Sequence, residues 1–104
     1  MSYEYNWQVN LENIHNACLF IHEEFNVLIN QGQMISLLFK QPSLLKQVNS
    51  GDVQKVALFN FICHHLIGRP YPSSAEFEDM DLEMLHDFKN SLVTSAQELG
   101  FTIK

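Results

Sequence analysis

Residues 53–72 read VQKVALFNFICHHLIGRPYP, and this stretch decides the fold class that the sequence predicts. Apolar side chains occur on every side of residues 53–67 when they are placed at helical spacing. A helix without a polar face is usually surrounded by other elements, so we expect residues 53–67 to be the central helix. Gly68, Pro70 and Pro72 cannot continue a helix, and they end this one.

The segments before this stretch have the spacing of further helices. Asn10 can cap a helix that ends near residues 30–32. Its apolar residues recur at intervals of three and four: Leu11, Ile14, Cys18, Ile21, Phe25 and Leu28. Residues 34–40 predict a short helix that Pro42 interrupts, and residues 43–48 another turn or two. After a break at residues 49–51, Asp52 is the expected cap of the central helix.

The segments after it predict two more helical stretches. Ser73 and Glu76 have the spacing of a capping box, which begins a short turn of helix. Residues 81–99 predict the last long helix, with its apolar stripe at Leu85, Phe88, Leu92, Ala96 and Leu99. Gly100 stands where a left-handed residue ends a helix, and Phe101 can then fold back on Ala96. We therefore expect a mainly α fold, a small bundle of about four helices in one domain over residues 1–104.

The first residues have a different pattern. Residues 3–9 alternate apolar and polar side chains, which is typical of a short strand. The same pattern fits an extended arm over the core. Residues 101–103 could pair with it as a second strand.

Composition excludes some classes of function. The net charge is −6, which argues against a nucleic-acid binder and against binding to an anionic membrane. The longest apolar run, at residues 17–21, is far shorter than a membrane span. No Lys or Arg precedes Lys40, unlike an ordinary secretory signal, so we expect a cytoplasmic protein with reduced cysteines.

Histidine and cysteine side chains suggest a metal site only weakly. His15, Cys18 and His22 lie near one face of the first predicted helix, and Cys63 and His64 lie on the central one. Neither an HExxH nor a CxxC motif is present, and core packing explains these residues equally well. We therefore expect no metal, no cofactor and no enzymatic activity, and a metal-dependent enzyme remains the weaker alternative.

The segment with the strongest indication of function is residues 71–83, YPSSAEFEDMDLE. Five carboxylates fall within eight residues: Glu76, Glu78, Asp79, Asp81 and Glu83. No Lys or Arg lies between Arg69 and Lys89 to neutralise them. Carboxylates attract a cationic partner, and the interleaved Tyr71 and Phe77 could add contact area, so we predict a partner-binding site here. The alternative is that the acids stabilise the next helix and that Phe77 and Met80 belong to the core.

Residues 66–81 resemble part of a known family. Leu66 and Ile67, then Tyr71 and the carboxylates, are similar to the acid-rich segment of bacterial toxin immunity proteins of the colicin or contact-dependent growth-inhibition type. The resemblance implies that Tyr71, Glu76, Glu78 and Asp79 contact a nuclease toxin. This sequence departs from the family pattern in having one tyrosine and an intervening run at residues 68–70.

We therefore expect an acidic binding protein that neutralises a basic protein partner, such as a nuclease toxin. An alternative is a helical adaptor or oligomerisation module. It would use Phe20 and Val27, which fall opposite the apolar stripe of the first predicted helix.

Overall fold

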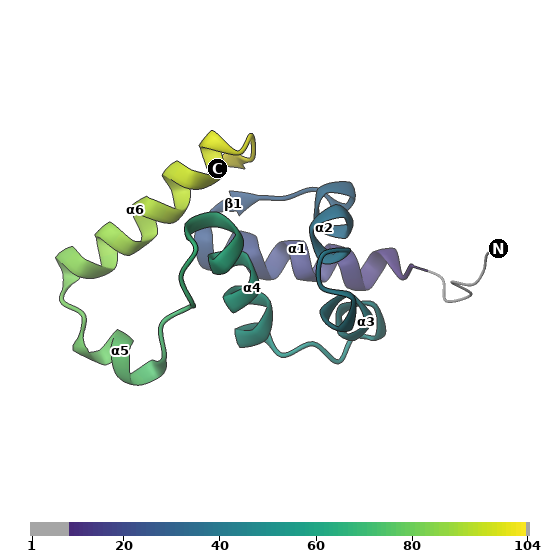
Figure 1. The fold of residues 1–104 in the computed structure, drawn as a ribbon, viewed down its shortest axis with the longest axis horizontal. Coiled ribbons are helices and arrows are strands. Elements are labelled where there is room, and N and C mark those ends of the chain that lie inside the picture. Colours follow the sequence, from purple (N-terminus) through teal and green to yellow (C-terminus); the bar gives the residue numbers. More distant parts are fainter. Residues whose placement is uncertain (1–8, 104) are drawn as a thin grey trace.

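The structure is a computed structural model that describes residues 9–103 (Figure 1). This range contains α1 (Leu11–Phe25), β1 (Val27–Leu28), α2 (Gln31–Leu38), α3 (Pro42–Ser50), α4 (Lys55–Ile67), α5 (Ser74–Asp79), α6 (Leu82–Glu98) and β2 (Thr102–Ile103). The predicted mainly α class is confirmed. Six helices form within the described residues instead of about four, because the stretches predicted as only one or two turns are complete helices, α3 and α5. Residues 3–8 of the expected strand or arm lie outside the described residues.

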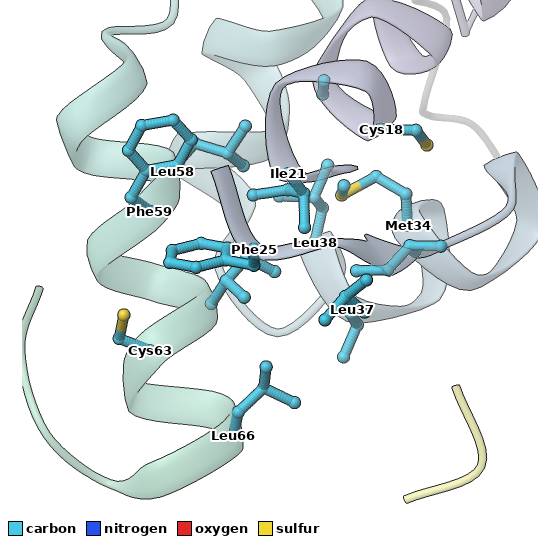
Figure 2. Close-up of a cluster of buried hydrophobic side chains, with 14 of the residues drawn as sticks. Cys18, Ile21, Phe25, Met34, Leu37, Leu38, Leu58, Phe59, Cys63 and Leu66 are labelled. Carbon is cyan, nitrogen blue, oxygen red and sulfur yellow. The ribbon is translucent and has the colours of Figure 1, made fainter. Parts of the chain in front are cut away.

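The centre of the fold is α1. It packs against α2, α3, α4 and α6, and its buried face carries Ile14, Ala17, Cys18, Ile21 and Phe25. Figure 2 shows Ile21 and Phe25 between the side chains of α2 on one side and those of α4 on the other. These apolar contacts, whose burial is the main force favouring folding, place α1 at the core.

The prediction that residues 53–67 form the central helix is wrong. The helix begins only at Lys55, and it buries one face, formed by Leu58, Phe59, Ile62, Cys63 and Leu66. Val56 on its other side is 65% exposed. A small domain has too few elements to surround a helix completely, and single apolar side chains are common on protein surfaces.

The first helix is shorter than predicted because of Asn26. This residue adopts the left-handed conformation, with φ of 61°, and ends α1 after Phe25. The chain then forms β1, which pairs antiparallel with β2, Val27 opposite Ile103 and Leu28 opposite Thr102. The strand predicted at residues 101–103 is therefore present at Thr102–Ile103, but its partner is β1, whereas pairing with residues 3–9 was predicted. Val27 is fully buried in this ribbon, so it cannot form the partner contact proposed with Phe20.

Asp52 does not cap the central helix, contrary to prediction. Its backbone N–H donates to the Gln47 carbonyl at 2.9 Å, and its carboxylate accepts from Ser50 at 3.3 Å. Both bonds bind Asp52 to the end of α3, where Gly51 has φ of 85°. Pro42 occupies the first turn of α3, a position that needs no backbone donor.

The last helix begins and ends as the sequence predicts. The Asp81 carboxylate accepts from the backbone N–H of Met84 at 2.8 Å, which caps the first turn of α6. At the other end Gly100 has φ of 94°, and the Phe101 N–H donates to the Ala96 carbonyl at 2.9 Å. This bond fixes the reversal that directs the chain into β2.

Candidate functional site

The predicted site lies on α5 and the beginning of α6, at the opposite end of the molecule from α3 (Figure 1). None of the residues of α5 is buried. We call the five carboxylates of this region the acidic surface: Glu76, Glu78, Asp79, Asp81 and Glu83. All five side chains are exposed.

A chain of aromatic rings attaches this region to the core. The Tyr71 ring centroid lies 6.0 Å from that of Phe25, 5.2 Å from Phe59 and 5.2 Å from Phe77. Phe77 in turn lies 6.2 Å from Phe88 on α6, in an edge-to-face arrangement. Aromatic pairs at these distances are favourable beyond the area they bury. The rings therefore connect α5 with the core and with α6.

Polar contacts fix Tyr71 further. Its backbone N–H donates to Oδ1 of Asn60 on α4 at 2.8 Å. Its hydroxyl donates to the carboxylate of Glu24 on α1. Burial, and then the Glu24 carboxylate, raise the pKa of the Tyr71 hydroxyl far above its usual value. Tyr71 is thus neutral at physiological pH.

These contacts change what Tyr71 and Phe77 can offer a partner. Both side chains are half-buried, and each packs against rings of its own chain. Phe77 is therefore placed as the packing alternative describes, and Tyr71 connects α1, α4 and α5.

Two of the five carboxylates cap helices. Glu76 accepts from the Ser73 N–H at 2.9 Å, while the Ser73 hydroxyl accepts from the Glu76 N–H at 3.1 Å. This reciprocal pair is the capping box predicted from the sequence, and it begins α5. Asp81 caps α6 through Met84. Helix capping therefore explains Glu76 and Asp81 without a binding partner.

The other three carboxylates make no capping hydrogen bond, although Glu83 lies in the first turn of α6, where the helix dipole favours negative charge. Among residues 9–103, no hydrogen bond or ion pair engages the carboxylates of Glu78, Asp79 or Glu83. They are exposed, and they remain available to a cation from outside the chain.

A groove lies beside the acidic surface, between α5, α6 and the segment that follows α4. Its volume is about 350 Å³. We call it the methionine groove, after the apolar side chains that line it: Pro70, Pro72, Met80, Met84 and Phe88. Glu76, Asp87 and Arg69 add polar atoms to the lining. Sequence reasoning noted Met80 but missed Met84, although the two are four residues apart.

In the part of the chain that the structure describes, no group of three or more His, Cys, Asp or Glu side chains is arranged to hold a metal ion. His15, Cys18 and His22 do line one shallow pocket, with apolar and amide side chains around them.

Neither cysteine is suited to act as a nucleophile. Burial raises the pKa of the Cys18 thiol to about 11. Burial and the Glu24 carboxylate raise that of Cys63 to about 12. Both cysteines are free thiols, and at neutral pH both remain protonated.

None of the helices within residues 9–103 is both long enough and apolar enough to cross a membrane. Comparisons with protein-family models, with curated proteins and with solved structures find no match for this chain.

Proposed function

We propose that this chain is a small acidic binding protein that covers a basic surface on another protein, and that it acts by binding and not by catalysis. The observation that carries this proposal is the set of three exposed carboxylates, Glu78, Asp79 and Glu83, which have no partner among residues 9–103.

Local stability does not account for Glu78 and Asp79, whereas Glu83 lies in the first turn of α6, where the helix dipole favours a carboxylate. Glu78 and Asp79 are the last two residues of α5, where the helix dipole disfavours negative charge. Asp79 also lies three residues after Glu76, a spacing at which like charges repel. Each effect costs a few tenths of a kcal/mol to about 1 kcal/mol. A cationic partner would remove this cost, because it would neutralise the charge where it is least favourable.

The partner class we propose is a nuclease toxin, with this chain as its immunity protein. Nucleases hold the phosphates of their substrate with lysine and arginine side chains. A row of carboxylates can occupy the same side chains and so exclude nucleic acid from the catalytic cleft. The net charge of −6 favours this encounter and disfavours binding to nucleic acid or to an anionic membrane. Cytoplasmic location belongs to the same proposal, since a nuclease toxin must be met where it reaches nucleic acid.

The test compares two variants of equal net charge. Glu78→Lys with Asp79→Lys reverses two charges of the acidic surface and changes the net charge from −6 to −2. Glu23→Lys with Glu98→Lys makes the same change elsewhere, near the carboxyl ends of α1 and α6, where positive charge is tolerated. Both controls are exposed residues.

When the wild-type chain is immobilised, it should retain a basic nuclease from an extract of the cells that produce this chain. The wild-type chain should also inhibit that nuclease. The variant with Glu23→Lys and Glu98→Lys should bind and inhibit as the wild type does. The variant with Glu78→Lys and Asp79→Lys should neither retain the nuclease nor inhibit it. Binding to the wild type should also weaken as salt concentration rises. Equal retention by both variants would remove the acidic surface from the mechanism, and an acidic retained partner would contradict the proposed charge complementarity.

A further inference from the structure

The methionine groove lies next to the acidic surface, and its lining is mostly apolar. Phe88 is only 8% exposed, whereas Met84 is 54% exposed. Phe88 therefore forms a buried part of the groove, and Met84 forms a wall that is accessible from solvent. Methionine side chains are flexible and polarizable, so such a wall can adapt to the shape of an inserted group. At about 350 Å³, the groove is at the small end of the range for ligand pockets, which suits one large side chain.

The charges around the groove indicate what kind of segment would carry that side chain. Residues 69–87 contain six carboxylates and one arginine, a net charge of −5. Two of these carboxylates, Glu76 and Asp87, belong to the groove lining together with Arg69. Within the described residues, the Asp87 carboxylate has no hydrogen bond or ion pair. An acidic segment would be repelled here, and a basic one attracted.

We propose that the methionine groove receives one large apolar side chain, such as leucine, methionine or phenylalanine, from a basic segment of the partner protein. Lysine and arginine residues on either side of that side chain pair with Asp87 and with the acidic surface. This inference rests on the proposed function and deepens it, since it names the feature of the partner that the chain selects.

The groove and the acidic surface have separate effects on binding. Exposed carboxylates mainly speed the encounter and make it sensitive to salt. A desolvated apolar anchor in a pocket mainly slows dissociation, because few residues carry most of the binding energy of an interface. Substitutions in the groove should therefore change the dissociation rate, and charge reversals at Glu78 and Asp79 the association rate.

The test uses a short peptide of lysine, arginine and alanine with one central leucine. The protein is labelled at its methionine methyl groups and observed by NMR. The signals of Met80 and Met84 should shift to saturation as peptide is added. Met34 is fully buried on α2, so its signal should not shift and serves as an internal control. Replacing the peptide's leucine by alanine should weaken binding about tenfold, since a buried leucine contributes at least that much.

A matched pair of protein variants completes the test. Met84→Gln keeps the length of the side chain and its helix propensity but makes it polar, and it should weaken peptide binding about tenfold. Leu99→Gln changes an apolar residue of equal exposure, 54%, beyond the other end of α6, and it should bind as the wild type does.

Three results would overturn this inference. The first is peptide binding that is unchanged when the peptide's leucine is replaced by alanine or Met84 by glutamine, but is lost in the variant with Glu78→Lys and Asp79→Lys. That result would leave the proposed function standing, with charge alone responsible. The second is no binding of the leucine peptide at millimolar concentration. The third is a dimer of the chain that Met84→Gln abolishes, because the groove would then hold a second copy.

Discussion

Tyr71→Phe is the substitution that tests most directly how the candidate site is attached to the core. It removes one oxygen atom and leaves the ring in contact with Phe25, Phe59 and Phe77. The lost bond is the one that the Tyr71 hydroxyl donates to the Glu24 carboxylate. Only this hydrogen bond is therefore tested, because the aromatic packing is retained.

The expected cost follows from the type of bond. A hydrogen bond to a charged group contributes about 1.5–3 kcal/mol. Glu24 is half-buried, so water can replace part of the lost bond, and we expect the lower end, about 1.5 kcal/mol. For a domain of this size, that loss corresponds to a decrease of about 6–12 °C in Tm. Chemical denaturation of the wild type and of Tyr71→Phe measures the difference between their free energies of unfolding.

The pH dependence gives a second readout with a definite sign. Tyr71 keeps its proton in the folded chain because its pKa is raised, whereas an unfolded tyrosine loses it near pH 10. The advantage of the wild type over Tyr71→Phe is therefore complete below about pH 10 and shrinks as pH rises through that value. The thiols of Cys18 and Cys63 weaken both proteins alike above about pH 9, since their pKa values are also raised. The difference between the two proteins isolates the tyrosine.

A double-mutant cycle pairs Tyr71→Phe with Glu24→Ala, which removes the acceptor of the hydrogen bond. If the hydrogen bond joins these two residues, the two single substitutions together should lower the free energy of unfolding by about 1 kcal/mol more, when their costs are summed, than the double substitution does. This role of the hydroxyl is contradicted if the free energy of unfolding of Tyr71→Phe lies within about 0.3 kcal/mol of that of the wild type at neutral pH. It is also contradicted if the two proteins lose stability in parallel above pH 10. Either result would mean that the Tyr71 hydroxyl does not help to attach this region to the core.

Three further substitutions or measurements test other parts of the structure. Asp81→Ala should destabilise the fold by about 1 kcal/mol in chemical denaturation, because it removes the cap on the Met84 N–H, and an unchanged midpoint would contradict that role. Leu92→Ala should cost about 2–5 kcal/mol in the same assay, since Leu92 is fully buried, and a cost below about 1 kcal/mol would mean that α6 is not packed as described. Cys18 and Cys63 should react slowly with a thiol reagent at pH 8 and rapidly in denaturant, because both are buried and protonated, and rapid reaction of the folded chain would contradict this.

The sequence predicted the features that depend on neighbouring residues. Ser73 with Glu76, Asp81 at the start of α6, and Gly100 after its end were all correct. Each is a short-range device in which a side chain or a backbone conformation satisfies the end of its own helix. Such features require no knowledge of the rest of the fold.

The error at Asp52 was local, since its contacts are with the end of α3, but two other errors arose where distant parts of the chain decide the outcome. Asn26 can stay in a helix or end it, and here the burial of Val27 against β2 accompanies the second choice. Residues 53–67 were expected at the centre because they are the most apolar. The centre is instead α1, which packs against four other helices. Hydrophobicity measures how much of a helix is apolar, but the positions of the other helices decide which face is covered.

The candidate site was predicted in part, for the same reason. The position of the carboxylates was evident from their spacing, but which of them have partners was not. Tyr71 contacts Glu24, which is 47 residues away in the sequence. The sequence contains no local signal for that contact, so the attachment of Tyr71 to the core was not predicted, and its contact with a partner stays a prediction.

Residues 71–87 thus combine two sets of side chains with different roles. One set holds the segment in place: Tyr71 and Phe77 by packing, and Glu76 and Asp81 by capping. The other set has no contact that the fold requires of it, namely the carboxylates of Glu78, Asp79 and Glu83 among the described residues. Because the two sets alternate along the chain, a substitution should affect either stability or binding, according to its position. If binding is lost only when stability is lost, these three carboxylates would have no function of their own, and charge at this surface would be incidental.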